Sequence, residues 1–165
     1  MDFSLYISNR DSVFHLPDMD SLTLEKRLHD VQNFVGVFPF DLLPKKPSGD
    51  FSLIVNTDNS TQPGDHWLVL SRKDSKIYFI DSYGRNYNDL TFDTDFVKSM
   101  RNFIGDEQAR YNQRWLQRLT SNVCGVYCIY FIKELTKHSF KYCLSVFNEN
   151  LAKNDQYVLN YLKDI

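Results

Sequence analysis

The sequence of 165 residues lacks the features of disulfide-bonded secreted proteins and of membrane-spanning proteins. It has only three cysteines, an odd number without regular spacing, which argues against a disulfide framework and favours a reducing compartment. No apolar run approaches the ~18 residues that cross a bilayer. The start of the chain, MDFSLYISNR, has no cationic segment followed by an apolar stretch. We therefore expect a soluble, unsecreted protein with no membrane partner.

Charge of one sign is not in excess either, and sequence repeats and low-complexity tracts are absent. The formal net charge is -2 at pH 7, so the basic excess of a non-specific nucleic-acid binder is missing. What is present is apolar content of 42%, with aromatic residues at 15%. A chain of this length and composition can bury one core built on large flat side chains. We expect one α+β domain over residues 1–165.

The first part of the chain predicts a helix and then an irregular segment. Residues 21–35 carry apolar side chains at helical spacing, with Ser21 as the expected N-cap and Gly36 as the expected stop. Residues 38–50 hold three prolines and a glycine, which predicts a loop. The apolar face of the expected helix is Leu24, Leu28, Val31 and Val35.

Strands and helices then follow in the rest of the sequence. Segments rich in β-branched and aromatic residues predict strands at 51–57, 66–72 and 76–82, the last two joined as a hairpin. Residues 109–117 are ambiguous and are compatible with a further strand. Helical spacing predicts helices at 94–104, from Cys124 onward, at 140–147 and at 151–162.

The stretch SNVCGVYC, residues 121–128, raises the question of what its two cysteines do. Four zinc ligands could come from Cys124, Cys128, Cys143 and one histidine, but no second tight pair completes such a set. A thioredoxin-like redox pair has two intervening residues, and this pair has three. Nucleophile and core packing are the remaining possibilities, and we expect no metal or other cofactor.

The positions of the two cysteines on the expected helix separate them. Cys124 would lie at the helix N-terminus, where unpaired N–H groups and the helix dipole favour a thiolate. Cys128 would lie one turn further on among large apolar side chains, where a thiol is inert. Cys124 is therefore the candidate nucleophile and Cys128 a packing residue.

A base and an orienting group for such a nucleophile lie upstream. His66 opens one expected strand and Asp81 closes its hairpin partner, so the antiparallel pairing brings both side chains to one edge of the sheet. Each also has a structural explanation, because a lone histidine is often structural and Asp81 could initiate a turn. An oxyanion hole could combine the N–H of Cys124 with the side chain of Gln113 or Gln117.

Four short blocks of this sequence resemble the adenain family of viral maturation proteases and the broader class of ubiquitin-like-protein proteases. The blocks are LIVNT, DHWLVL, YFIDSYG and LQRLTSNVCGVYCIYF, in chain order. A further block, GVFPFDLLP, is similar to proteases of virophages and Polinton-type (Maverick) elements. The resemblance spans roughly residues 20–135 and implies a mixed central sheet flanked by helices, with the nucleophile on a central helix.

The resemblance also assigns roles to individual residues. It implies His66 as general base, Asp81 as its orienting partner and Cys124 as nucleophile. Gln117, seven residues before the nucleophile, becomes the oxyanion donor in place of Gln113. It implies that Trp67 lines the substrate cleft, and core packing is an equal explanation for a tryptophan there.

Gly125 has an expected role beside the nucleophile. A glycine at this position keeps the start of the helix clear where a substrate backbone approaches. With Trp67, it completes the expected substrate-binding residues.

The function implied is a cysteine endopeptidase that cleaves viral capsid or other structural precursors after small, glycine-containing sites. The alternatives are a deconjugase of ubiquitin-like modifiers and a catalytically silent interaction domain. Adenain is stimulated by a peptide that is disulfide-linked to an upstream cysteine, and by DNA. This chain has no cysteine before Cys124 and no basic excess, so neither activator is expected. We expect a monomer in the virion and at the site of virion assembly.

Overall fold

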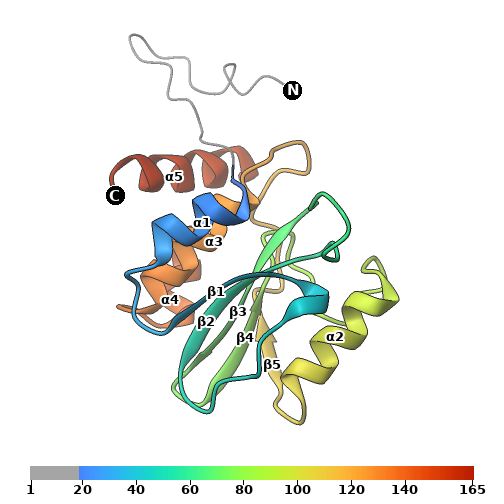
Figure 1. The fold of residues 1–165 in the computed structure, drawn as a ribbon. Coiled ribbons are helices and arrows are strands. Elements are labelled where there is room, and N and C mark those ends of the chain that lie inside the picture. The colour runs from blue at the N-terminus through green and yellow to red at the C-terminus, as the bar shows by residue number, and fades with distance from the viewer. Residues whose placement is uncertain (1–18) are drawn as a thin grey trace.

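The computed structural model describes residues 19–165, which form an α+β fold around a mixed five-stranded sheet (Figure 1). The strands stand in chain order across the sheet. The outer pairs β1–β2 and β4–β5 are parallel, and the two inner pairs are antiparallel. The strands are β1 (Phe34–Pro39), β2 (Phe51–Asn56), β3 (Trp67–Lys73), β4 (Lys76–Ile80) and β5 (Ala109–Tyr111).

Helices cover both faces of this sheet. On one face, α2 (Thr94–Ile104) packs with a single 3-10 turn, η2 (Phe40–Leu42), over an aromatic-rich core. Figure 1 shows the remaining helices gathered on the other face. They are α1 (Ser21–Leu28), α3 (Cys124–Leu135), α4 (Phe140–Ser145) and α5 (Leu151–Lys163).

The helix α3 is the central helix of its layer. Nearly every residue from Cys124 to Ile132 is at most 5% exposed, because the sheet, α1, α4 and α5 surround it. This explains why its sequence is apolar all round rather than on one stripe. The burial confirms the sequence-based expectation of a central, buried helix that begins at Cys124.

The hairpin of β3 and β4 positions one edge of the sheet beside α3. Val69 pairs with Ile80, so the residues just before β3 lie opposite those just after β4. The connection turns at Asp74 and Ser75, both with positive φ (50° and 64°), as in the tight turns that match strand twist. The predicted hairpin is therefore confirmed, with β3 running one residue later than expected.

The expected helix at 21–35 was wrong in its second half. The helix ends at Leu28, and its N-cap is Asp20, which accepts from the N–H of Thr23 over 2.8 Å, rather than Ser21. The chain then turns through Asn33 (φ 65°) into β1, a strand that the sequence did not predict. Parallel pairing with β2 satisfies the backbone there and overrides the helical spacing.

Gly36, the expected helix stop, instead lies within β1. The register of the β1–β2 pair shifts between Phe34 and Gly36, and Gly36 has a φ of 145° that favours glycine. Residues 38–50 start in β1 and η2 and are irregular only afterwards. Prediction and structure agree for α2, and for β2, α4 and α5 within one or two residues; β5 is a short strand within the ambiguous segment.

The helices of the described part of the chain are all too short or too polar to span a bilayer.

Candidate functional site

Cys124 occupies the first position of α3, with its side chain in a nearly enclosed place. The residue is 5% exposed, and the residue before it, Val123, provides no side-chain cap for the first turn. Cys124 therefore lies at the positive end of the helix dipole, in the turn whose N–H groups lack intrahelical partners.

His66 and Asp81 meet at the sheet edge that faces this helix start. Nε2 of His66 lies 2.7 Å from Oδ1 of Asp81, and both residues are buried. His66 immediately precedes β3 and Asp81 immediately follows β4, so the antiparallel pairing places them together. The structure thus brings together the two side chains that the sequence pattern paired.

The imidazole of His66 interacts with Cys124 as well as with Asp81. Burial alone would lower the pKa of His66, but hydrogen bonds with Asp81 and Cys124 and their negative charges raise it to about 9. The ring thus has the carboxylate and the sulfur as its two interaction partners. His66 therefore links Asp81 and Cys124 into one connected group of side chains.

The carboxylate of Asp81 is held from several sides. Arg85 donates from Nε to Oδ2 over 2.7 Å, and the N–H of Tyr83 donates to Oδ1 over 3.1 Å. Burial would raise the pKa of Asp81, but the bonds and charges of His66 and Arg85 outweigh it and hold the pKa below its usual value. Asp81 therefore stays ionised in a fully buried position.

Asp81 also starts a turn, which the sequence offered as an alternative to catalysis. The N–H of Gly84 donates to the carbonyl of Asp81 over 2.7 Å, and the Tyr83 N–H bond to its side chain adds an Asx-type contact. The turn interpretation is therefore confirmed, and the catalytic role of Asp81 stays a prediction. The backbone carbonyl of Asp81 closes the turn, and Oδ1 of its side chain contacts both the Tyr83 N–H and His66.

The turn residues after Asp81 contribute to the site in ways that sequence analysis missed. The ring of Tyr83 stacks on His66 with centroids 4.8 Å apart and contacts Trp115 at 5.4 Å. Burial, together with the charges of Cys124 and Asp81, raises the pKa of Tyr83 to about 12, so its phenol stays neutral. The only sequence signal for these residues was their position directly after Asp81, in the stretch DSYGR that follows β4.

Gln117 lies within a buried hydrogen-bond chain close to the start of α3. Its Oε1 accepts from the hydroxyl of Ser82 over 2.6 Å, and its Nε2 donates to the carbonyl of Ser121 over 3.0 Å. Gln117 has no exposed surface, whereas Gln113, the other candidate, is exposed. The buried amide belongs to the neighbourhood of Cys124, and Gln113 does not share its environment.

Trp67 and Gly125 both contact Met19, where the described chain begins. The indole Nε1 of Trp67 donates to the carbonyl of Met19 over 2.8 Å. A Cβ on Gly125 would lie 3.0 Å from Cβ of Met19 and 3.4 Å from Leu24 Cδ2. Close packing against α1 is therefore a structural reason for a glycine at this position. The expected contacts of Trp67 and Gly125 with a substrate stay predictions.

Two cavities adjoin the expected site. One, of about 330 Å³, lies beside His66 and Tyr83 and is bordered by Arg85. The other, of about 200 Å³, lies along one side of Trp67 and is lined by residues of β1 and of the segment after β2. The site residues are thus flanked by hollows large enough for individual side chains of a bound chain.

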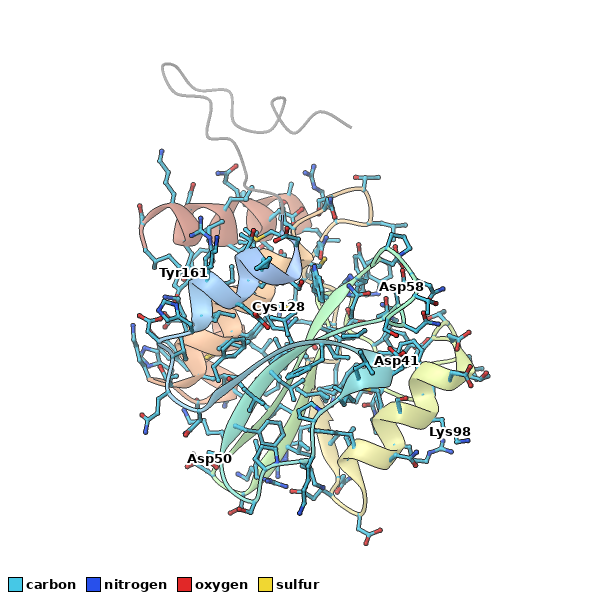
Figure 2. The ribbon with its side chains drawn as sticks, viewed as in Figure 1. Asp41, Asp50, Asp58, Lys98, Cys128 and Tyr161 are labelled. Atoms are coloured by element: carbon cyan, nitrogen blue, oxygen red, sulfur yellow. The ribbon has the colours of Figure 1, made fainter. Side chains whose placement is uncertain are left out.

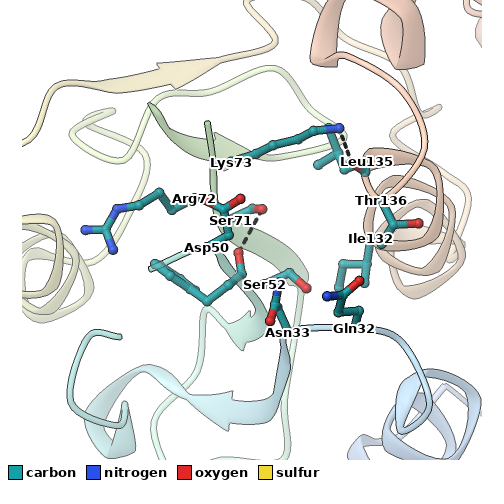
Figure 3. Close-up of a pocket in the computed structure, with 11 residues that line it drawn as sticks. Gln32, Asn33, Asp50, Ser52, Ser71, Arg72, Lys73, Ile132, Leu135 and Thr136 are labelled. Carbon is teal, nitrogen blue, oxygen red and sulfur yellow. Dashed lines mark hydrogen bonds between the residues drawn. The ribbon is translucent and has the colours of Figure 1, made fainter. Parts of the chain in front are cut away.

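A third cavity, of about 220 Å³, lies at the other end of the sheet and of α3 (Figure 3). Its border includes Asp50, which precedes β2, and Thr136, which follows α3. Figure 2 shows Asp50 and Asp58 at opposite ends of the β2 strand, and Asp58 lines the hollow beside His66. The third cavity is therefore remote from Cys124.

Cys128 has the inert surroundings that its sequence predicts. Figure 2 shows it inside the layer of helices, and it is 3% exposed. Burial, together with the charges of Cys124 and Asp81, raises its pKa well above the ordinary value. The three cysteines are free thiols, and residues 19–165 contain no group of three or more His, Cys, Asp or Glu side chains that could hold a metal ion.

No protein-family model matches this chain, and no curated protein matches it.

Proposed function

We propose that this protein is a cysteine endopeptidase of the adenain and ubiquitin-like-protein protease type. The observation that carries the proposal is the connected group of His66, Asp81 and Cys124, with Cys124 at the N-terminus of a buried helix. Nucleophile, base and orienting carboxylate come from three separate elements. Packing alone does not require a buried carboxylate, an imidazole and a thiol in contact.

Catalysis would begin with a proton held by His66 and a thiolate on Cys124. The thiolate attacks the scissile carbonyl carbon, and the carbonyl oxygen takes the negative charge. The backbone N–H of Cys124 and the side-chain amide of Gln117 would donate to this oxygen. His66 then gives its proton to the leaving amine, so that the C–N bond breaks and a thioester remains on Cys124.

The second half of the reaction would release the acyl product. His66, now neutral, takes a proton from a water molecule, and the resulting hydroxide attacks the thioester. The C–S bond breaks, a carboxylic acid forms and Cys124 recovers its thiolate beside protonated His66. Asp81 would orient the ring throughout, because its carboxylate holds Nε2 and so leaves Nδ1 for the sulfur.

The proposed substrates are the structural precursor proteins of a virus or virus-like element, cut after small residues. This part of the proposal follows from the sequence resemblance, including the GVFPFDLLP block. A narrow cleft beside the indole of Trp67 would favour glycine at the scissile bond. The place of action would be the virion and the site where it is assembled.

The test of this function combines substrate cleavage with thiol labelling. The purified protein is incubated with a library of fluorogenic tetrapeptides and, separately, with ubiquitin-like fusion proteins. We expect peptide cleavage by the wild type, its loss in Cys124→Ala and near-normal rates in Cys128→Ala. Iodoacetamide at neutral pH should modify Cys124 alone among the three cysteines.

Four outcomes would count against the proposal. Retained cleavage in Cys124→Ala, or loss in a folded Cys128→Ala, would refute the assignment of the nucleophile. An unreactive Cys124 together with no cleavage would support the catalytically silent interaction domain. Cleavage of ubiquitin-like fusions and not of peptides would redirect the proposal to a deconjugase.

A further inference from the structure

Ser82 connects the orienting carboxylate of the site to the buried amide of Gln117. It directly follows Asp81, is 4% exposed and donates its hydroxyl to Oε1 of Gln117 over 2.6 Å. We propose that Ser82 is a positioning residue that fixes the Gln117 amide with its N–H groups toward the start of α3. This inference rests on the proposed hydrolase function and assigns a role within it.

The two ends of the Gln117 amide have partners that permit only one orientation. Oε1 accepts from Ser82, and Nε2 donates one of its two N–H groups to the carbonyl of Ser121, three residues before Cys124. An inverted amide would set Oε1 against the Ser121 carbonyl, with two acceptors facing each other. In the observed orientation one N–H of Nε2 bonds Ser121, and the other would donate to the oxygen of a reacting carbonyl.

The backbone of Ser82 holds the same segment. Its carbonyl accepts from the N–H of Leu116 over 2.8 Å and from the N–H of Gln117 over 3.1 Å. The carbonyl of Ser82 thus holds the backbone of Gln117, and the hydroxyl of Ser82 orients the Gln117 side chain. Because Asp81 holds His66, two consecutive residues would orient the base and the oxyanion donor from one rigid turn.

Burial makes the hydroxyl hard to replace. The Ser82 hydroxyl is the donor that Oε1 bonds, so its removal leaves this buried oxygen without that partner. Without this bond the Gln117 amide would rotate so that Oε1 reaches another donor. The rotation would move Nε2 away from the Ser121 carbonyl and from the start of α3. The expected defect is therefore in stabilising the oxyanion, with the reactivity of Cys124 intact.

The experiment compares Ser82→Ala with Ser82→Thr, which keeps a hydroxyl. Ser71→Ala is the matched control, because Ser71 is a buried serine of the same sheet whose hydroxyl donates to the Phe51 carbonyl over 3.0 Å. Two rates are measured: turnover of the best peptide from the library, and alkylation of Cys124 by iodoacetamide. Alkylation occurs at a saturated carbon and forms no oxyanion, so it reports on Cys124, His66 and Asp81 alone.

We expect Ser82→Ala to lower kcat by roughly 10- to 100-fold, less than the 10²–10³-fold typical for loss of an oxyanion donor. KM and the alkylation rate should stay within about twofold of wild type. Ser82→Thr should recover most of kcat, and Ser71→Ala should keep it. Adding Ser82→Ala to Gln117→Ala should cause no further loss, since both act on one donor.

Several results would overturn the inference. They are a normal kcat in Ser82→Ala, a parallel fall in alkylation rate, multiplicative losses in the double variant, or an equal loss in Ser71→Ala. Failure of the proposed function looks different, because the wild type itself would then cleave no peptide, and the role of Ser82 would fall with it. Thermal melting of each variant shows whether it is folded, and Ser82→Thr keeps the test decisive if Ser82→Ala does not fold.

Discussion

Arg85 donates from Nε to Oδ2 of Asp81 over 2.7 Å, on the oxygen opposite to the one that faces His66. The guanidinium lies over the ring of Phe92 at 4.0 Å, and Nη1 donates to the hydroxyl of Thr91 over 3.2 Å. These three contacts fix the Arg85 side chain, which can therefore restrain the carboxylate of Asp81. Arg85 therefore stabilises the ionised form of Asp81 in a place without solvent.

Replacement of Arg85 by Gln should weaken both folding and the proposed catalysis. It removes a charge-assisted bond to a buried carboxylate, which is worth about 1.5–3 kcal/mol. Urea denaturation should show a loss in this range, and the alkylation rate of Cys124 should fall because His66 loses a fixed partner. Arg110→Gln, an exposed arginine on β5, is the control. Equal stability of Arg85→Gln and wild type would contradict this role.

The raised pKa of His66 predicts a pH-dependent stability. The group binds its proton more tightly in the folded state, at a pKa of about 9, than at its ordinary value of 6.5. Its contribution to the free energy of unfolding is therefore complete below pH 6.5 and is lost as the pH rises through 9. The wild type should lose stability over this window relative to His66→Gln, whereas the control His29→Gln, at an exposed histidine, should follow the wild type.

Urea denaturation at pH 6, 7.5 and 9 measures this effect. Asp81→Asn should move the loss to lower pH, because the hydrogen bond and charge of Asp81 help to hold the imidazole pKa up. Parallel stability curves for wild type and His66→Gln would show that His66 does not titrate as stated.

Gly84 should tolerate no side chain. Its φ is 76°, and a Cβ would lie 2.4 Å from the carbonyl carbon of Arg114, a backbone atom that cannot move aside alone. The left-handed conformation alone costs about 1–2 kcal/mol for alanine, and relieving the clash would displace the segment that carries Trp115 and Gln117. Gly84→Ala should thus lower both the melting temperature and peptide cleavage.

The matched control for this variant is Gly49→Ala. An added Cβ at Gly49 has no atom within 4 Å, so stability and activity should stay near those of wild type. A Gly84→Ala variant as stable as Gly49→Ala would mean that the turn after β4 adapts more than its packing indicates.

Lys73 should matter for stability and not for activity. Its Nζ donates to the carbonyls of Leu135 and His138, the latter over 2.6 Å, and so satisfies free carbonyls at the C-terminal end of α3. Figure 3 shows this side chain reaching across the remote cavity to Leu135. Lys73→Met should cost about 1 kcal/mol in urea denaturation with kcat unchanged. Lys98→Met, at an exposed lysine of α2, controls for the loss of charge.

The errors of sequence interpretation are concentrated in β1. Val31 and Val35 continue the helical spacing of Leu24 and Leu28, so the local pattern favoured one long helix. Pairing with β2 decided otherwise, because it is a long-range contact between segments whose sequences do not reveal it. The helix α2 was predicted to the residue, since its spacing and caps are local.

The candidate site shows the same division. Adjacent strands and a tight turn made the meeting of His66 and Asp81 predictable, and the start of α3 marked Cys124. The sequence did not predict the roles of three turn residues. Ser82 contacts Gln117 in the loop before α3, Tyr83 stacks on His66, and Arg85 bonds Asp81. No rule of sequence spacing predicts contacts of this kind. Gln117 was distinguished from Gln113 by resemblance, and the structure adds that only Gln117 is buried beside the site.

The sequence by itself determined the elements governed by local rules: the β3–β4 hairpin, the helices from α2 onward, and the buried surroundings of Cys128. Only the tertiary structure decided the edge position of β1, the close packing of Gly84 and Gly125, and the chain from Arg85 through Asp81 and His66 to Cys124. The reason is physical. Spacing and turn propensity act over a few residues, whereas burial of a charge and orientation of an amide depend on partners brought together by the whole fold.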